Sequence, residues 1–179
     1  MSTHITLHRP ALAELPALEA LYTASFPPEE RRPWDMVAAG GDTPCLLCIS
    51  APDEPHAGLV SLWRFPQFTY IEHLCTAHAL RGRGLGGAVL AALRAEGRPL
   101  LLEVEHPQGP DSMEQRRIDF YRRNGFGVLD YPYIQPPYAP GLPEVPLLLM
   151  CTDTRIDAAG AARVLHSFVY NSPEPGEKP

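Results

Sequence analysis

Residues 81 to 86, with the sequence R-G-R-G-L-G, have the side chains and spacing of a phosphate-binding loop. The three glycines lack a Cβ atom, so a ligand can approach their backbone N–H groups closely. The periodic apolar stretch from 84 to 96 predicts a helix, whose first turn presents unpaired N–H groups and a positive dipole end. Arg81 and Arg83 add guanidinium groups that suit phosphate geometry. The sequence therefore predicts a phosphate-bearing cofactor where a strand, this loop and a helix meet.

A dinucleotide is one cofactor class that fits this loop. Its glycine spacing also matches G-x-G-x-x-G, and Glu103 follows at about the distance of a ribose-binding acid. In dinucleotide folds, however, the first glycine directly follows a buried apolar strand, whereas residues 77–81 intervene here. The preceding strand also carries Glu72 and His73, which are unusual in a strand covered on both faces. A dinucleotide-binding oxidoreductase is therefore the less favoured interpretation.

Two segments, Arg81–Gly86 and Ile118–Phe126, point to a second class, the acyl-coenzyme A enzymes. The first resembles the (Q/R)-x-x-G-x-(G/A) motif of the GNAT superfamily of N-acyltransferases. The second, I-D-F-Y-R-R-N-G-F, is similar to the helix-to-strand segment F-Y-x-x-x-G-F of that superfamily. One predicted strand, Leu100 to Glu105, separates the two predicted helices as it does in the superfamily. With the strands around these segments, the resemblance extends to about residue 150.

The resemblance implies acetyl-coenzyme A as the acyl donor and assigns it a set of residues. In the superfamily the backbone at the end of the strand pairs with the pantetheine arm like an added strand. Transfer of the acyl group is usually direct in the superfamily, and the spacing does not identify a histidine that would activate Cys75. A nucleophilic thiol is therefore not expected. The implied cofactor-binding residues are Leu74, Cys75, Thr76, Arg81, Gly82, Arg83, Gly84, Leu85, Gly86 and Tyr121.

N-acyl transfer needs a neutral amine and a proton for the departing thiolate. By the resemblance, Tyr121 is the candidate acid near the coenzyme A sulfur; the alternative is a core aromatic beside Phe120. Glu72 is the candidate base. A carboxylate on a central strand must be paired or face a wet cleft, so the alternative for Glu72 is an ion pair with an arginine. Glu103 and Glu105, on one face of the next strand, are rival bases.

The helix before Tyr121 departs from the superfamily pattern at two positions. An asparagine and a small residue often precede the tyrosine there, and this chain has Glu114 and Arg117 instead. A cofactor contact is therefore not expected from Glu114. Arg117 either reaches the cofactor or pairs with Glu103 or Glu105.

Composition narrows the function classes further. The chain has 179 residues, enough for one domain with a substantial core. A formal charge of −6 argues against nucleic acid as the main partner, because phosphate binding needs a basic face. No apolar run reaches membrane-spanning length, and the first residues lack the features of a signal peptide. A cytoplasmic location and no membrane partner are therefore expected.

No metal site is expected from the four cysteines, at positions 45, 48, 75 and 151. Cys45 and Cys48 have C-x-x-C spacing, but no second pair completes a zinc site. They lie in an apolar run that predicts a strand, where residues three apart point to opposite faces. Buried, reduced thiols are the favoured interpretation.

Periodicity and turn residues predict the order strand, two helices, three strands, helix, strand, helix and two strands. This is the element order of the GNAT fold, an α/β domain with a mixed, splayed central sheet and helices on both faces. An extra helix at the C-terminus is a packing or dimer element. The predicted strands are 4–8, 45–51, 57–65, 67–76, 100–105, 127–134 and 145–151. The predicted helices are 10–22, 34–39, 84–96, 112–124 and 156–169.

The expected organisation is an N-acetyltransferase domain at 1–152, a helical extension at 153–170 and a disordered tail at 171–179. The predicted reaction moves an acetyl group to a primary amine of a small molecule or peptide, in a monomer or homodimer. The alternative is a non-catalytic acyl-coenzyme A binding or regulatory domain that keeps the loop but lacks turnover. The presence of both Tyr121 and Glu72 argues against it.

Overall fold

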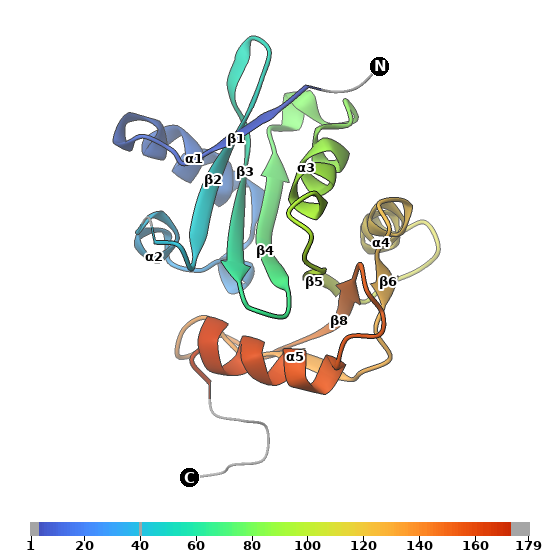
Figure 1. Ribbon diagram of the computed structural model, residues 1–179. Coiled ribbons are helices and arrows are strands. Elements are labelled where there is room, and N and C mark those ends of the chain that lie inside the picture. Colours follow the sequence, from blue (N-terminus) through green and yellow to red (C-terminus); the bar gives the residue numbers. More distant parts are fainter. Residues whose placement is uncertain (1–3, 40, 173–179) are drawn as a thin grey trace. The chain divides into compact units, whose positions relative to one another are not determined.

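The computed structural model describes residues 4–39 and 41–172 and divides into two compact units, Met1–Leu100 and Leu101–Pro179. In each unit, antiparallel strand pairs form the frame on which the helices and loops are placed (Figure 1).

Four antiparallel strands, in the order β1-β2-β3-β4, form the frame of the first unit. They are β1 (Thr6–His8), β2 (Cys45–Ala51), β3 (Glu54–Arg64) and β4 (Thr69–Thr76). The strand β3 is buried without interruption from Ala57 to Trp63, which indicates that both of its faces are covered.

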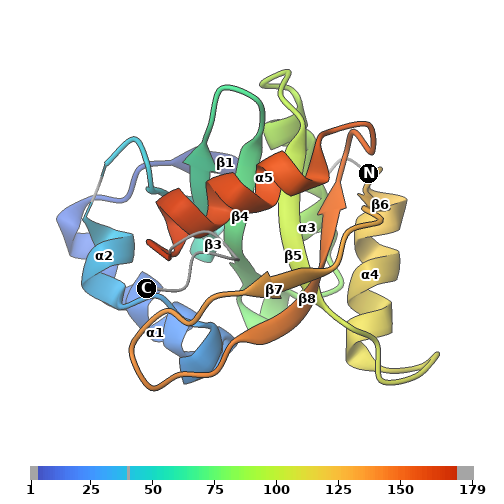
Figure 2. The same ribbon diagram turned by 90° about the horizontal axis from the view of Figure 1, so that it is seen from below.

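Helices cover both faces of these strands. In both views α1 (Leu15–Ser25) and α2 (Trp34–Ala38) lie on one side of β3 and β4, and α3 (Leu85–Arg94) lies on the other (Figure 2). Three short 3-10 turns, η1 (Leu12–Glu14), η2 (Pro28–Glu30) and η3 (His78–Leu80), lead into or link these elements.

One apolar core joins α1 and α2 to the strands. Its buried members are Leu18, Tyr22, Val37, Leu46, Cys48, Leu59 and Cys75. Leu46 and Cys48 are two residues apart on β2, so both point to the face that α1 covers. Cys45 therefore points to the opposite face of the strand.

The pairing of β3 with β4 shifts by one residue at Glu72. Ser61 pairs with His73, whereas the next residue, Leu62, pairs with Ile71. Glu72 is therefore the extra residue of a β-bulge, which redirects side chains from strict alternation. As a result Glu72 and His73, although adjacent in sequence, both contact the segment between α1 and α2.

In the second unit β8 is the central strand, and it pairs antiparallel with β5, β6 and β7. The helix α4 ends one turn before β6, and Gly125 (φ 87°) makes the turn between them. After β8 the chain forms α5, which continues into a π-helical turn at Leu165–Val169. The bounds are β5 (Leu100–Glu105), α4 (Met113–Arg123), β6 (Gly127–Val128), β7 (Tyr133–Gln135), β8 (Val145–Cys151) and α5 (Ala158–Val164).

The predicted α/β class, element order and extra C-terminal helix are confirmed. One predicted strand, 127–134, is wrong, because it consists of two short strands separated by a turn at residues 129–132. Pro132 lies in this turn and has no N–H to continue a strand ladder. Part of the predicted tail, 173–179, lies outside the described residues. Within the described ranges, no helix has both the length and the apolar character to cross a bilayer.

Candidate functional site

The predicted phosphate-binding loop connects η3 to α3, and two of its glycines have a backbone conformation that other residues rarely adopt. Gly82 and Gly84 have φ of 77° and 80°, in the left-handed region that favours glycine. Gly84 is the N-cap of α3, and its carbonyl accepts the N–H of Ala88 at 3.0 Å. Residues 81–84 are all exposed. The loop therefore presents a tightly turned backbone to solvent at the start of a helix.

The first turn of α3 presents hydrogen-bond donors beside this backbone. The first N–H groups of an α-helix have no preceding helical carbonyl as acceptor. Gly86 and Gly87 lie in this turn and have no side chains to cover those groups. Arg81 and Arg83 are exposed on either side of Gly82. Donors, a positive dipole end and two guanidinium groups in one loop can bind a phosphate or pyrophosphate.

The end of β4, just before this loop, contains Leu74, Cys75 and Thr76. Its backbone pairs with β3 from Gly58 to Val60. The side chain of Cys75 packs in the core beneath α1. Burial raises the pKa of this thiol, so it stays in the protonated, unreactive form. A nucleophilic role for Cys75 is therefore not supported.

Glu72 is the centre of a buried hydrogen-bonded cluster in the first unit. Its side chain is 0% exposed, and that of Arg32 is 7% exposed. Arg32 Nε donates to Oε1 at 2.8 Å, while Trp63 Nε1 and Ser61 Oγ donate to Oε2 at 2.8 and 3.3 Å. The guanidinium of Arg32 also lies 5.2 Å from the centroid of the Trp63 ring. The ion pair with an arginine, one of the two sequence-based alternatives for Glu72, is present.

His73 extends this cluster toward α1. Its Nε2 lies 2.9 Å from the carbonyl oxygen of Glu30 and 3.2 Å from the hydroxyl of Tyr22. A carbonyl oxygen can only accept, so Nε2 carries a proton and Nδ1 faces Glu72 Oε2 at 3.9 Å. Burial lowers the pKa of His73, which favours this neutral form. The histidine therefore links β4 to the loop that precedes α2.

Tyr121 lies on α4 in the second unit and is half-buried among aromatic rings. Its ring centroid is 5.2 Å from that of Phe120 and 5.5 Å from that of Phe126. Burial raises the pKa of Tyr121 to about 12, against the opposing effect of the Arg117 charge. The hydroxyl therefore keeps its proton at neutral pH and can donate a hydrogen bond. Tyr121 therefore both packs against neighbouring aromatic rings and carries a hydroxyl that can donate a hydrogen bond.

The two rival bases on β5 also have partners. Arg117 is ion-paired with Glu105, which settles which acid it contacts. Glu103 accepts hydrogen bonds from the hydroxyl of Tyr133 and, at 2.7 Å, from that of Tyr170. Burial and the charge of Glu103 raise the pKa of Tyr133. The last helical segment thus reaches β5 through Tyr170.

Sequence reasoning missed most partners of these acids. The hairpin β3–β4 could have placed Ser61 and Trp63 near Glu72. In an antiparallel hairpin the residue numbers of two paired residues add up to a nearly constant value, so the partners of Glu72 can be found from the position of the turn. Arg32 gives no such signal, since it is 40 residues from Glu72 and belongs to no strand. The same is true of Tyr170, which lies 67 residues from Glu103.

Comparison with known proteins identifies relatives of the chain. The family model of the acetyltransferase (GNAT) domain matches residues 45–128. A solved structure of a provisionally assigned GNAT acetyltransferase from Bacteroides thetaiotaomicron is 32% identical, with a TM-score of 0.81. That alignment covers 94% of this chain and 99% of the other.

Two further similar proteins come from Bacillus subtilis. YjbC of strain 168, a provisionally named acetyltransferase, is 34% identical over 74 residues, or 41% of this chain; this stretch is only 38% of that protein. An acetyltransferase solved in complex with CoA is 17% identical, with a TM-score of 0.55. Its alignment covers 85% of this chain and 99% of the other, and this likeness shows a shared fold alone.

Proposed function

The chain belongs to the GNAT family of acetyltransferases, and from this premise we propose that it moves an acetyl group from acetyl-coenzyme A to a primary amine of a small molecule or peptide. The amine attacks the thioester carbonyl directly and loses a proton to a base, the carbon–sulfur bond breaks, and coenzyme A leaves as a thiolate that takes a proton from water. The glycine loop at the start of α3 carries this proposal, because its exposed backbone, helix N-terminus and paired arginines suit a pyrophosphate.

The acyl donor is proposed to bind along β4 and the loop. The segment Arg81–Gly86 would hold the pyrophosphate through backbone N–H groups and the two arginines. The backbone of Leu74, Cys75 and Thr76 would hydrogen-bond the pantetheine arm as an added strand does. The Bacillus subtilis acetyltransferase that shares this fold was solved with CoA, which supports the choice of ligand.

Tyr121 is proposed to stabilise the departing thiolate. Its pKa is raised to about 12, so the donor is the neutral hydroxyl. A thiol has a pKa of about 8.5, and complete proton transfer from this tyrosine to the thiolate would cost on the order of 5 kcal/mol. A charge-assisted hydrogen bond avoids that cost and still stabilises the charge that develops on sulfur. Tyr121 therefore acts chiefly as a hydrogen-bond donor.

Glu72 is proposed to accept the proton of the amine, directly or through water. An ionised carboxylate has about four acceptor sites, and Arg32, Trp63 and Ser61 occupy three of them. The remaining site on Oε1 is the position where a water or an amine would be bound. Because the side chain is fully buried, this role requires water or substrate to reach Oε1.

The hydrogen bonds that the candidate bases already accept support the non-catalytic alternative. Glu72, Glu103 and Glu105 all accept hydrogen bonds from neighbouring side chains. A domain with only structural acids would bind acyl-coenzyme A through the same loop but would not turn it over. Binding and turnover must therefore be measured separately.

Calorimetry and thermal unfolding with acetyl-coenzyme A, coenzyme A and NAD test the donor. At a ligand concentration near 100 times Kd, either coenzyme should raise stability by about 2.7 kcal/mol, and NAD should have no effect. Equal stabilisation by NAD would contradict the acyl-donor assignment. Release of free thiol is then followed across primary amines and peptides, where binding without release for every acceptor would favour the non-catalytic domain. We also propose a cytoplasmic location and a monomeric or homodimeric state. Analytical ultracentrifugation measures the oligomeric state.

A further inference from the structure

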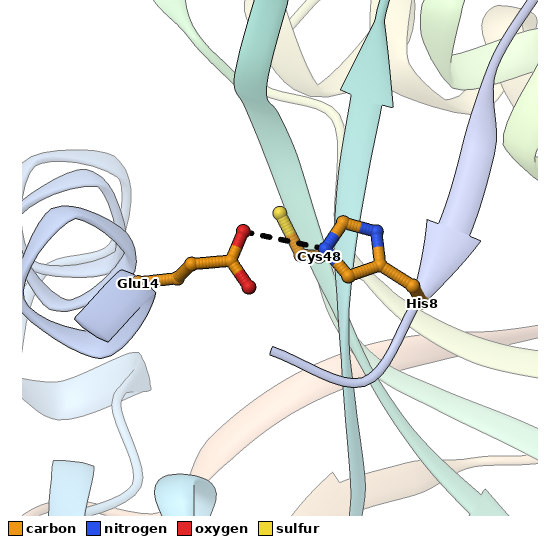
Figure 3. A group of neighbouring side chains, drawn as sticks. All are labelled: His8, Glu14 and Cys48. Atoms are coloured by element: carbon orange, nitrogen blue, oxygen red, sulfur yellow. Dashed lines mark hydrogen bonds and ion pairs between the residues drawn. The ribbon is translucent and has the colours of Figure 1, made fainter. Parts of the chain in front are cut away.

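A second group of reactive side chains lies in the first unit, apart from the glycine loop and the Glu72 cluster. His8, Glu14 and Cys48 each provide one donor atom, and these three atoms all lie within 4.8 Å of one another (Figure 3). The donors are an imidazole nitrogen, a carboxylate oxygen and a thiol sulfur. None of the roles proposed above uses these residues.

The strand pairing explains why these donors meet. His8 on β1 and Cys48 on β2 are directly opposite each other in the antiparallel register, so their side chains leave the sheet on the same face. That face is the one that α1 covers, because Cys48 belongs to the α1 core. Glu14 ends η1, immediately before α1, and Figure 3 shows its carboxylate pointing toward the other two side chains.

A second histidine contacts the same carboxylate. His8 Nε2 lies 3.3 Å from Glu14 Oε1, and His56 Nε2, from β3, lies 3.4 Å from that oxygen. Around a tetrahedral zinc ion with bonds of about 2.0–2.2 Å, adjacent nitrogen and oxygen ligands are about 3.3–3.5 Å apart. These two nitrogen–oxygen separations match two edges of a zinc tetrahedron. His56 is not one of the three residues whose donor atoms all lie within 4.8 Å of one another, so its side chain, which is 34% exposed, would have to rotate to complete the tetrahedron.

The carboxylate is oriented by a hydrogen bond outside the group. Glu14 Oε2 accepts the backbone N–H of Ala11 at 2.8 Å, which turns Oε1 toward the imidazoles. Hydrogen bonds of this kind are a usual feature of metal-binding carboxylates. The same N–H, together with His8, holds the pKa of Glu14 below its usual value, so the carboxylate is ionised at neutral pH.

The thiol of Cys48 is protonated, and a bound metal ion would displace its proton. Its side chain is fully buried and its Sγ donates to the carbonyl oxygen of Pro55 at 3.4 Å. Burial, with the charge of Glu14, raises the pKa of the thiol, which is therefore protonated. A bound Zn²⁺ replaces the thiol proton, which leaves to solvent as the sulfur–zinc bond forms.

We propose that His8, Glu14 and Cys48, with His56 as the fourth ligand, bind one Zn²⁺ ion. Two neutral imidazoles, a thiolate and a carboxylate form a mixed set that suits zinc, and the two negative charges balance those of the ion. All four positions are taken by the protein, as in structural zinc sites. The ion would join β1, which has only three residues, to η1, β2 and β3.

Metal binding is tested on tag-free protein, because a histidine tag would itself bind zinc. Dialysis against Zn²⁺ followed by elemental analysis should give one ion per chain. Zinc at 100 times its Kd should raise Tm by about 5–10 °C, and EDTA should reverse the rise. A Co²⁺ titration should produce the cobalt–thiolate charge-transfer band that reports a cysteine ligand. Absence of that band, or no zinc retained, would overturn the proposal.

Substitutions locate the site. Cys48→Ser, His8→Gln and His56→Gln should each weaken zinc affinity by at least about tenfold, and Cys48→Ser should also abolish the thiolate band. Cys45→Ser is the matched control, since Cys45 is buried on the same strand but points to the opposite face; it should bind zinc normally. If Cys48→Ser does not fold, the half-exposed His56 provides the second variant. Unchanged affinity in both His8→Gln and His56→Gln would place the ion elsewhere.

Discussion

At the scale of single residues, Tyr121 separates catalysis from packing. The change Tyr121→Phe keeps the ring that contacts Phe120 and Phe126 and removes only the hydroxyl. If the hydroxyl stabilises the thiolate, kcat should fall by roughly 10²-fold, with little change in coenzyme A affinity or Tm. Steady-state kinetics, calorimetry and thermal unfolding of the two proteins measure these quantities. A variant with full activity would assign Tyr121 to packing alone.

The buried pair of Arg32 and Glu72 leads to a prediction about stability. Glu72→Gln leaves the Arg32 charge buried without its carboxylate, which should lower the free energy of unfolding by about 3–5 kcal/mol. The double variant with Arg32→Met should lose less than the sum of the two single losses, because neither charge then remains unpaired. Denaturant unfolding of the four proteins measures this coupling. Additive losses would show that the pair contributes nothing of its own.

The catalytic role of Glu72 is tested through pH. A base must be ionised to accept the amine proton, so kcat/KM should rise with pH and then flatten. Glu72→Gln cannot accept that proton and should cost on the order of 10²-fold at neutral pH. Part of this loss should return at high pH, where the amine deprotonates unaided. A profile of unchanged shape with near-normal rates, in a variant that is only less stable, would leave the ion pair as the whole role of Glu72.

The sequence could place Glu72 and Tyr121 on their elements but not describe their surroundings. An acid on a central strand predicts some partner, because an unpaired buried charge is costly. Which partner cannot be predicted, since the contact with Arg32 joins a loop to a strand 40 residues away. The bulge at Glu72 also breaks the alternation on which a sequence-based assignment of faces depends.

At the scale of elements, the glycine loop offers a matched pair of substitutions. Gly82 and Gly97 have φ of 77° and 82°, and an added Cβ would meet no atom within 4 Å at either position. Gly82→Ala and Gly97→Ala should therefore cost similar stability, about 1–2 kcal/mol, from backbone strain alone. Only Gly82→Ala should weaken coenzyme A binding, because only this Cβ stands where the phosphate would approach the loop. Calorimetry that finds equal affinity in both variants would place the phosphate elsewhere.

Most elements were predicted within a few residues, and the misses have local causes. The first predicted helix, 10–22, begins later, at Leu15, which places Pro16 in the first turn of α1, where its missing N–H does no harm. The last helix begins at Ala158 rather than Ile156, because Asp157 caps it by accepting the N–H of Gly160. Its π-helical end, Leu165–Val169, leaves no signal in the apolar spacing.

At the scale of the whole molecule, one histidine is buried in the described part of each unit. His73, in the first unit, and His166, in the second, are 3% and 7% exposed. Burial lowers the pKa of both, and His166 Nε2 donates to the carbonyl oxygen of Ile134 at 2.9 Å. Below about pH 6.5 the unfolded chain binds more protons at these histidines than the folded chain does, because their pKa is lowered on folding. Their contribution to stability is therefore complete above about pH 6.5 and is lost as the pH falls below it.

We expect the free energy of unfolding to fall between pH 7 and pH 5, by up to about 1.4 kcal/mol per pH unit for each histidine. His73→Gln and His166→Gln should each reduce that slope, because glutamine can keep an N–H donor but does not titrate. Both tryptophans, Trp34 and Trp63, lie in the first unit, so their fluorescence follows that unit, whereas circular dichroism follows both. His106→Gln, at an exposed position, is the control.

The two signals distinguish independent from cooperative unfolding. If the units unfold separately, His73→Gln changes the pH slope seen by fluorescence, and His166→Gln changes only the slope seen by circular dichroism. If they unfold together, both substitutions change both signals equally. EDTA is included so that no metal ion contributes to the slope. The fluorescence measurement gives the change in the free energy of unfolding per pH unit. If this value is the same in His73→Gln as in the wild type, His73 is not the source of the acid sensitivity, because the variant lacks that titrating group and is otherwise identical.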